Sequence, residues 1–586
     1  MIGLKPRCNG PQGRLGLLCV ALSLPLATPL TAATIRVDDD NTTTVQQGTV
    51  QYPYNSLQIA IDQAANGDTI QVARGTYGNI DNKNKALTLL GGYPGATATD
   101  YQAGVGGDFV QQSAMQGGDT IISGGAAQIG VTLTRNTPDA AFFLIFDRLT
   151  VSASRKGILC DNAVSWPQAK DVTISNSIIE NNGLPGDISL GAGILLCGEN
   201  ATIINNLIRN NQGGRGAGLT TLGSVMNVLI KGNRIENNIC YDDHGGGIYL
   251  AGTAILEDNL ISGNRIDLGY GWGGGVLILG TAKMSRNIIT DNYAPTYGGG
   301  VFIDEGATAE LDHELIYRNR IAVGGYGGAG LAVDNGAPGP SHLTLTNSTV
   351  AENVSDNRFG GSGLYIDNVS TATVRNSVFW GNGTDFYVRT GSSLSVTYSL
   401  SQQGWSGAGN LSQDPLFANP TTGDFHLRSR AGRYNPATAS WVIDAEHSPA
   451  IDVGDPSAAF VNEPAPNGAR VNLGAFGNTA QASLSDGTPP THRLTLTNRG
   501  GPLGRVVSTP AGILCGTTCS ALFVAGTQVV LTASATPGSV FTSWGNACQG
   551  RQTDCIVTLS EDRLATATFM TPGKGGWWRA MPWLKQ

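Results

Sequence analysis

The amino-acid sequence predicts an all-β chain, built as a parallel solenoid of short strands and followed by a small disulfide-stapled β domain. Glycine accounts for 81 of the 586 residues and charged residues for only 14%, against about 25% in typical globular domains. From about residue 170 to 385, a pattern of glycines, apolar residues and an asparagine returns every 26 to 34 residues. Within each cycle, segments such as "NLISGN" and "NIITDN" have the alternating, β-branched pattern of strands and lack helical spacing.

The first 33 residues have the features of a signal peptide for export. Three basic residues precede the apolar run "LGLLCVALSLPLATPL", and the small residues at 31–33 suit cleavage. No other segment approaches the roughly 20 apolar residues that cross a bilayer as a helix. We therefore expect a bacterial protein that is secreted, extracellular or on the outer cell surface, with no transmembrane segment after signal removal. The net charge of −8 is spread thinly along the chain, which predicts no nucleic-acid partner.

A capping helix is predicted before the first coil, in the stretch "SLQIAIDQAANGDTIQV". Ser56 is a favourable N-cap residue, and Gly67 is a stop signal before the strand "TIQV". Four apolar residues between them fall on one helical face: Leu57, Ala60, Ile61 and Ala64. We expect this face to cover the open end of the stack of coils.

The asparagine that ends each cycle predicts one coil of a solenoid per repeat. A period of about 27 residues is too short for a propeller blade but suits a coil whose strands pair with the coils above and below, about 4.8 Å apart. Asparagine tolerates the left-handed conformation of a bend, and stacked amides can hydrogen-bond along the axis. The repeated asparagines are Asn182, Asn211, Asn238, Asn264, Asn292, Asn319, Asn353 and Asn382.

A second unit follows the solenoid. We assign residues 484–491 to a linker, 492–570 to a small β-sandwich-like domain with glycine turns between alternating strands, and 571–586 to a tryptophan-rich tail. Four cysteines in the domain allow three disulfide pairings, of which we favour the two local ones: Cys515, Cys519, Cys548 and Cys555.

Three further cysteines remain after the signal, so the total is odd. Cys160 and Cys197 fall at matching places in "GILC" and "GILLC", and we expect them on neighbouring coils. A disulfide and a pair of stacked free thiols are equally compatible with that placement.

Three stretches of the chain resemble known families. The capping helix and the strand after it resemble the start of the right-handed parallel β-helix proteins of the pectin-lyase-like superfamily. The glycine and asparagine cycles are similar to the repeats of polymorphic outer-membrane proteins and related adhesins, and residues 448–483 resemble the closing segment common after bacterial β-helices. The resemblance implies a right-handed parallel β-helix over residues 34–483 but no single activity, because this fold hosts lyases, hydrolases, epimerases, adhesins and scaffolds. The C-terminal unit resembles accessory repeat modules of secreted bacterial proteins.

An aromatic ring or an imidazole precedes the paired glycines in five consecutive cycles, and Tyr270 lies close to one of them. These rings can form a strip whose flat faces stack on sugar rings, which predicts a polysaccharide or cell-surface glycan as partner. They can equally stack on one another and seal the loops where glycine leaves the core thin. The five positions are His244, Trp272, Tyr297, Tyr326 and Phe359.

Three aspartates recur four residues after the last glycine of their cycles: Asp304, Asp334 and Asp367. Their aliphatic neighbours are expected to point inward, so the carboxylates are expected to point outward on successive coils. Stacked carboxylates repel one another, which raises their pKa values or recruits a cation such as Ca²⁺. The resemblance to pectate-lyase-like enzymes also implies calcium beside external aspartates. Ordinary turn chemistry is the alternative, because each aspartate ends a strand in "DN" or "DEG".

The predicted function is therefore the binding of polysaccharide, or adhesion, along the solenoid. A Ca²⁺-assisted polysaccharide lyase or related carbohydrate-active enzyme is the alternative, with Arg320, Arg358 and His244 as catalytic candidates, because a lyase needs a base beside the uronate carboxyl. A glycoside hydrolase would instead need two carboxylates at a defined separation. A third interpretation is a structural spacer that displays the C-terminal module.

Overall fold

The computed structural model describes residues 32–571 apart from 112–118, 135–142, 161–170, 197–199, 223–226, 323, 337–338, 356–359, 488–490, 517–518, 525 and 560. Nearly all of the predicted signal peptide and of the tryptophan-rich tail lie outside the described residues. Across the described part of the chain, we find no helix with the length and apolar character needed to span a membrane.

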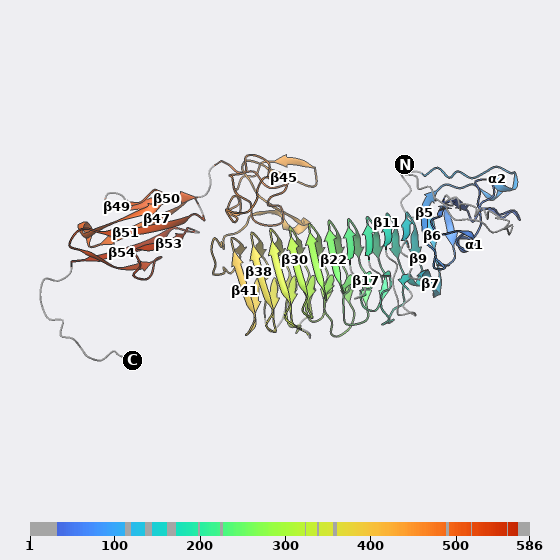
Figure 1. The fold of residues 1–586 in the computed structure, drawn as a ribbon, viewed down its shortest axis with the longest axis horizontal. Coiled ribbons are helices and arrows are strands. Elements are labelled where there is room, and N and C mark those ends of the chain that lie inside the picture. Colours follow the sequence, from blue (N-terminus) through green and yellow to red (C-terminus); the bar gives the residue numbers. More distant parts are fainter. Residues whose placement is uncertain are drawn as a thin grey trace, which may run out of the picture.

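The solenoid consists of parallel strands that recur once per coil and stack into long sheets (Figure 1). Sheet A has 13 strands among the described residues: β1 (Thr34–Val37), β2 (Thr69–Ala73), β5 (Leu87–Tyr93), β8 (Phe143–Asp147), β11 (Asp171–Ser175), β14 (Asn200–Ile204), β18 (Asn227–Lys231), β22 (Thr253–Glu257), β26 (Thr281–Ser285), β30 (Thr308–Asp312), β34 (His342–Thr346), β38 (Thr371–Arg375) and β41 (Ser393–Thr397). Sheet B follows sheet A in each coil and contains β3 (Gly75–Tyr77), β6 (Thr120–Ile122), β9 (Thr150–Ser152), β12 (Ile178–Glu180), β15 (Leu207–Arg209), β19 (Arg234–Glu236), β23 (Leu260–Ser262), β27 (Ile288–Thr290), β31 (Leu315–Tyr317), β35 (Thr349–Ala351), β39 (Val378–Trp380) and β42 (Leu400–Ser401).

Two further sheets complete the coils. The short sheet D follows sheet B in the middle coils and contains β16 (Gln212–Gly213), β20 (Ile239–Cys240), β24 (Arg265–Ile266), β28 (Tyr293–Ala294), β32 (Arg320–Ile321) and β36 (Val354–Ser355). Sheet C ends each coil and contains β4 (Ile80–Asp81), β7 (Gly125–Leu133), β10 (Ser154–Cys160), β13 (Ile194–Leu196), β17 (Leu219–Thr221), β21 (Ile248–Leu250), β25 (Val276–Ile278), β29 (Val301–Ile303), β33 (Leu331–Val333), β37 (Leu364–Ile366) and β40 (Phe386–Val388).

Alternation along each strand builds the core. In β30, Ala309 and Leu311 are buried, while Thr308 and Glu310 are exposed. The next coil repeats the pattern in exact register, since Leu311 pairs with Leu345 of β34. Buried aliphatic residues thereby form one continuous core from Val37 to Val396. The predicted all-β solenoid with parallel pairing between coils is confirmed.

Two buried ladders of polar side chains run along the axis at the bends. The ladder after sheet B contains the predicted asparagines, and each amide donates to the Oδ1 of the next, as from Asn264 to Asn292 at 3.0 Å. The second ladder, between sheets A and B, contains Asn206, Asn233, Asn259 and Asn287 and then continues into Glu314. Each asparagine of the two ladders also donates to a backbone carbonyl of the preceding coil, so the bends leave few polar groups unpaired.

The predicted capping helix is α1 (Leu57–Gln63). The Ser56 side chain accepts a hydrogen bond from the Ile59 backbone N–H at 3.4 Å, which confirms the N-cap. Its four predicted apolar residues join the core at the N-terminal end of the solenoid (Figure 1). A second short helix, α2 (Ala98–Gln102), carries a capping box between Thr97 and Asp100.

Residues 402–487 form a flanking segment that packs along the outer face of sheet B. It contains β43 (Phe417–Asn419), η2 (Pro420–Thr422), β44 (Asp424–Leu427), β45 (Arg433–Asn435) and β46 (Ser440–Val442). Its Phe417 and Phe425 pack against Tyr317 and Val378, whose side chains point outward from sheet B. The segment therefore lies beside the last coils, and Figure 1 shows β45 over the yellow ones.

The C-terminal domain is a sandwich of two four-stranded sheets, ordered β50-β47-β54-β52 and β49-β48-β51-β53. Its strands are β47 (Thr491–Arg499), β48 (Gly504–Thr509), β49 (Leu514–Cys515), β50 (Ser520–Val524), β51 (Gln528–Ala535), β52 (Val540–Asn546), β53 (Asp554–Thr558) and β54 (Arg563–Met570), with a short helix η3 (Gly501–Leu503). Its own apolar core includes Leu494, Leu531 and Trp544.

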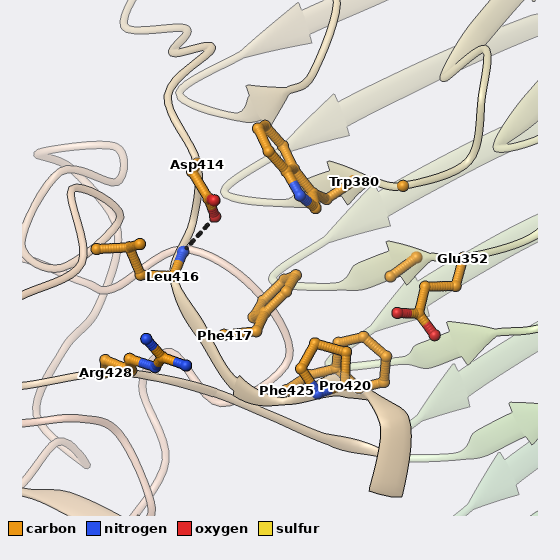
Figure 2. A pocket seen from close by; sticks show the side chains of 10 residues that line it. Glu352, Trp380, Asp414, Leu416, Phe417, Pro420, Phe425 and Arg428 are labelled. Carbon is orange, nitrogen blue, oxygen red and sulfur yellow. Dashed lines mark hydrogen bonds between the residues drawn. The ribbon is translucent and has the colours of Figure 1, made fainter. Parts of the chain in front are cut away.

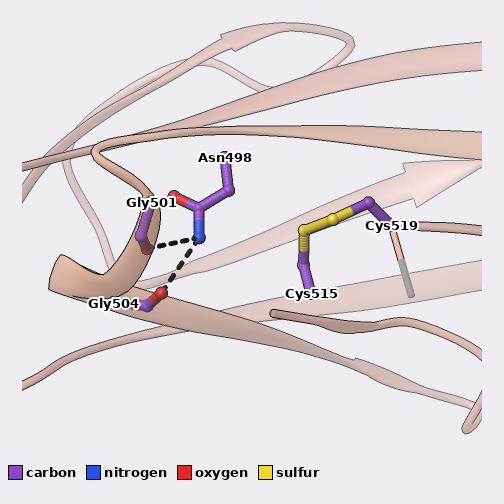
Figure 3. Close-up of a disulfide and its surroundings, with 5 residues drawn as sticks. All are labelled: Asn498, Gly501, Gly504, Cys515 and Cys519. Carbon is purple, nitrogen blue, oxygen red and sulfur yellow. Dashed lines mark hydrogen bonds between the residues drawn. A yellow bond between two sulfur atoms is a disulfide. The ribbon is translucent and has the colours of Figure 1, made fainter. Parts of the chain in front are cut away.

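Two disulfides staple this domain. Cys515 is bonded to Cys519 and Cys548 to Cys555, so the two local pairings are confirmed. Figure 3 shows the first of them near Asn498, whose Nδ2 donates to the backbone carbonyls of Gly501 (3.2 Å) and Gly504 (2.9 Å). In the solenoid, Cys160 is also disulfide-bonded, and Cys197 lies outside the described residues.

Candidate functional site

The outer face of sheet C carries a second, external cluster of apolar side chains. In its three-residue strands from β21 to β40, the first and last residues pack in or against the core, and the middle residue points outward. These outward residues are Tyr249, Leu277, Phe302, Ala332, Tyr365 and Tyr387 along successive coils. We call this face from β21 to β40, with the glycine loops that fold over it, the ring surface.

Glycine is required in these loops because backbone and ladder approach them closely. A Cβ atom built on Gly275 would lie 2.6 Å from the carbonyl oxygen of Gly300 and 3.0 Å from the Nδ2 of Asn292. On the preceding residue, Gly274, it would lie 2.5 Å from the backbone of Tyr293. The chain therefore turns against the next coil here, and the ring before the glycines comes to lie over sheet C.

Four of the five predicted rings gather on the ring surface. His244, Trp272 and Tyr297 pair in register from coil to coil, and the centroids of His244 and Trp272 lie 4.5 Å apart. Tyr297 stacks on Phe302 of its own coil, with centroids 5.6 Å apart.

Tyr326 departs from the predicted register but stays in the cluster. Tyr297 pairs with Gly327, one residue later. The Tyr326 ring instead lies flat against Tyr297, at 5.1 Å and 13°, and keeps 45% of its surface exposed. Tyr270, on the loop beside Trp272, is 57% exposed, and Phe359 lies outside the described residues.

The three predicted aspartates form a column at the edge of the ring surface, directly after β29, β33 and β37. Asp304 accepts a hydrogen bond from the Gly336 backbone N–H at 2.6 Å, and Asp334 accepts one from Asn368 Nδ2 at 2.7 Å. Burial raises the pKa of Asp334, and the charges of Asp304 and Asp367 add to that rise. The expected crowding of carboxylates along the coils is therefore present.

Asp367 belongs to this outward column but is only 4% exposed. Its Oδ2 accepts hydrogen bonds from the Tyr365 hydroxyl at 2.9 Å and from Arg389 Nη1 at 2.6 Å. Arg389 occupies the next step of the same column, since Ile366 pairs with Val388. The sequence signal was available, because "FYVR" at 386–389 repeats the pattern of "LYID" at 364–367.

Within the described ranges, no group of three or more histidine, cysteine, aspartate or glutamate side chains is arranged to hold a metal ion. Backbone and side-chain donors already occupy one oxygen of Asp304 and of Asp334 and both oxygens of Asp367. Calcium binding by this column stays a prediction.

The rings and the carboxylates belong to one surface. Burial raises the pKa of Tyr297, with further contributions from Tyr365 and from the charges of Asp334 and Asp367. At the opposite end, Tyr249 lies near Glu305 and Arg215, and Arg215 pairs with Asp242 at 3.2 Å. The ring surface is thus bordered by charged groups along its length.

The predicted catalytic residues do not come together on this surface. Arg320 begins β32 of sheet D, is exposed, and forms no ion pair with any described residue. The His244 imidazole pairs with the adjacent Asp243 carboxylate. Arg358 lies outside the described residues.

Comparisons with known proteins agree with this architecture. The family model described as "Right handed beta helix region" matches residues 121–283 and 224–400, "Disaggregatase related" matches 382–454, and "Divergent InlB B-repeat domain" matches 506–572. Among solved structures, pectate lyase Pel9A is similar at 11% identity and a TM-score of 0.39, over 76% of this chain and 96% of that one. No curated protein matches the sequence. With the parallel sheets and continuous core described above, these matches show that the chain has the fold of a right-handed parallel β-helix, followed by a C-terminal domain similar to divergent InlB B-repeat domains.

Proposed function

We propose that the ring surface binds an extended polysaccharide outside the cell. The observation that carries this proposal is the stack of Tyr326 on Tyr297, which presents an exposed aromatic face beside a column of carboxylates. Aromatic faces pack against the C–H faces of sugar rings, and charged groups at the border form strong hydrogen bonds with hydroxyls.

The fixed geometry of the rings favours binding. Trp272 and Tyr297 are half-buried and packed against Phe302. Side chains that are already ordered lose little conformational entropy when a ligand binds. Because consecutive coils are about 4.8 Å apart, rings on several coils form an elongated surface, which suits a polymer better than a small molecule.

Binding is favoured over lyase chemistry because the described catalytic candidates are not gathered at the carboxylate column. Arg320 begins a strand of sheet D, and the His244 imidazole pairs with Asp243. The cation that does lie at the column, Arg389, is paired with Asp367 at 2.6 Å. The disulfides of the C-terminal domain support an extracellular location, because such bonds persist in oxidising compartments.

The test is affinity electrophoresis of the mature protein in gels that contain neutral or acidic polysaccharides. Tyr326→Ala is expected to weaken the retardation about fivefold, which corresponds to about 1 kcal/mol of lost ring contact, without change in melting temperature. Trp441→Ala is the matched control, since Trp441 is 43% exposed on the flanking segment. If both variants are retarded like the parent protein, the proposal is wrong for that panel. A large loss of stability in Tyr326→Ala would favour a structural stack instead.

A further inference from the structure

A separate cavity of about 310 Å³ lies between sheet B and the flanking segment (Figure 2). Glu352, directly after β35, and Trp380, at the end of β39, line its solenoid side. Asp414, Phe417, Phe425 and Arg428 line the side of the flanking segment. Because the cavity opens on sheet B, it is distinct from the ring surface on sheet C.

The floor of the cavity is aromatic and rigid. Phe417 and Phe425 are only 6% and 1% exposed, and their rings meet edge to face at 5.1 Å. Phe425 also packs on Tyr317 of β31 at 4.9 Å. Trp380 lines one side of the cavity and is only half-buried.

Several polar groups of the cavity have unused hydrogen-bonding capacity. Among the described residues, neither the Glu352 carboxylate nor the Trp380 indole N–H has a hydrogen-bond partner. Asp414 accepts from the Leu416 backbone N–H through Oδ1 at 2.8 Å, which leaves its other oxygen available. Figure 2 shows the Glu352 and Asp414 carboxylates on opposite sides of the aromatic floor.

The charge of the cavity selects among ligands. Its single cation, Arg428, is paired with the Glu446 carboxylate. Two carboxylates therefore face the cavity without a free positive charge, which disfavours uronic acids and other anions. Carboxylate acceptors and an indole donor are suited to a group of hydroxyls, and the indole face is suited to one side of a sugar ring.

The size restricts the ligand further. A volume of about 310 Å³ lies at the lower end of the range for small-molecule pockets. From this geometry we infer that the cavity binds a single neutral pyranose unit, such as a chain end or a side branch. This site does not depend on the ring surface, so the two proposals can fail separately.

The experiment titrates the full mature chain with methyl glycosides of glucose, galactose, mannose and N-acetylglucosamine, followed by saturation-transfer NMR and calorimetry. Methyl glucuronide and tetramethylammonium are the counter-probes. At least one neutral glycoside is expected to bind saturably and more tightly than either counter-probe. Trp380→Ala and Glu352→Gln are each expected to weaken that binding at least tenfold, while Tyr326→Ala leaves it unchanged.

Three results would overturn the inference: no saturable binding of any neutral glycoside, stronger binding of a counter-probe, or binding that depends on Tyr326 and not on Trp380 and Glu352. Glu352→Gln protects the test against misfolding, because the Glu352 carboxylate has no partner to lose among the described residues. If Trp380→Ala unfolds the flanking segment, the glycoside binding of Glu352→Gln alone tests the inference.

Discussion

Glu314 continues a buried asparagine ladder by accepting a hydrogen bond from Asn287, whose Nδ2 lies 2.9 Å from the Glu314 Oε1. Glu314 is fully buried, and no described residue contacts its second oxygen by a hydrogen bond. Burial raises the pKa of Glu314 to about 8. A carboxyl that remains neutral at pH 7 thus occupies a position that amides fill on the preceding coils.

The first prediction concerns the pH dependence of stability. The folded pKa of about 8 exceeds the ordinary value of 4.5, so the folded state holds this proton more tightly. The stability contributed by Glu314 is complete below about pH 4.5, falls by up to about 1.4 kcal/mol per pH unit as the pH rises through 8, and then levels off. Glu314→Gln removes this dependence, so the variant is expected to match the parent near pH 5 and to exceed it near pH 9.

Thermal unfolding of both proteins from pH 5 to 9 measures this difference. Glu310→Gln is the control, because Glu310 sits on the exposed face of the same coil, 3.0 Å from Lys283. Its melting curve is expected to run parallel to that of the parent. Parallel curves for Glu314→Gln as well would contradict the prediction.

The second prediction concerns the predicted asparagine ladder. Asn292 donates to the Ile261 carbonyl at 2.9 Å and to Asn319 Oδ1 at 3.0 Å, and it accepts from Asn264. Asn292→Ala leaves buried partners unpaired on two coils, at about 1–3 kcal/mol each. We expect a loss of at least 3 kcal/mol in the unfolding free energy, measured by urea denaturation.

Asn227→Ala is the matched control for the ladder. Asn227 also donates to an asparagine, Asn200, at 3.2 Å, but on the exposed face of sheet A. Its replacement is expected to change stability by less than about 0.5 kcal/mol. Similar losses of unfolding free energy in the two variants would mean that a buried asparagine of the ladder stabilises the fold no more than an exposed one.

The solenoid itself could be predicted from sequence because each coil repeats a local pattern. The final asparagines, the Ser56 N-cap and the local disulfides all depend on neighbours that are close in the chain or one period away. Glu314 is not placed in a ladder by the period of the last asparagine of each cycle, because it lies at the other bend of its coil. Aligning "LDHELI" with "MSRNII" puts Glu314 opposite Asn287 and would have revealed the other ladder.

Two kinds of feature could not be predicted in this way: those that arise where one coil differs in length from the next, and those that arise where the chain turns back along the solenoid. Tyr326 leaves the predicted register because its pairing with the neighbouring coil is shifted by one residue, to Gly327. The cavity beside Trp380 requires the flanking segment to return along sheet B and bring Asp414 and Phe425 to it. No periodicity relates these residues.

The third prediction concerns the pair of Asp367 and Arg389. The Asp367 side chain is 5% exposed and that of Arg389 45%, so solvent screens the pair on one side only. Arg389→Ala leaves a nearly buried carboxylate without its cation, and we expect the melting temperature to fall. Asp367→Asn in the Arg389→Ala background should reverse part of that decrease.

Arg320→Ala provides the comparison, because exposed Arg320 forms no ion pair within the described chain. Its melting temperature is expected to stay within one degree of the parent. Equal losses for Arg389→Ala and Arg320→Ala would show that the column on sheet C adds no stability.

The last prediction tests why glycines and a tryptophan occur together in "GYGWGGG" at 269–275. Alanine at Gly275 would bring its Cβ 2.6 Å from the Gly300 carbonyl oxygen, which the paired backbone cannot move away from. A Cβ at Gly269 would meet nothing within 4 Å. Gly275→Ala is therefore expected to lower the unfolding free energy by about 2 kcal/mol or more, through overpacking, and Gly269→Ala to leave it unchanged. The emission of Trp272 reports the cause. Because the chain has nine tryptophans, this emission is obtained by subtracting the spectrum of the matching Trp272→Phe variant. It should shift to longer wavelength in Gly275→Ala only, because the ring lies over sheet C only while the glycines contact the next coil. Unchanged emission together with lost stability would show that the close packing of the glycines does not determine the position of the Trp272 ring.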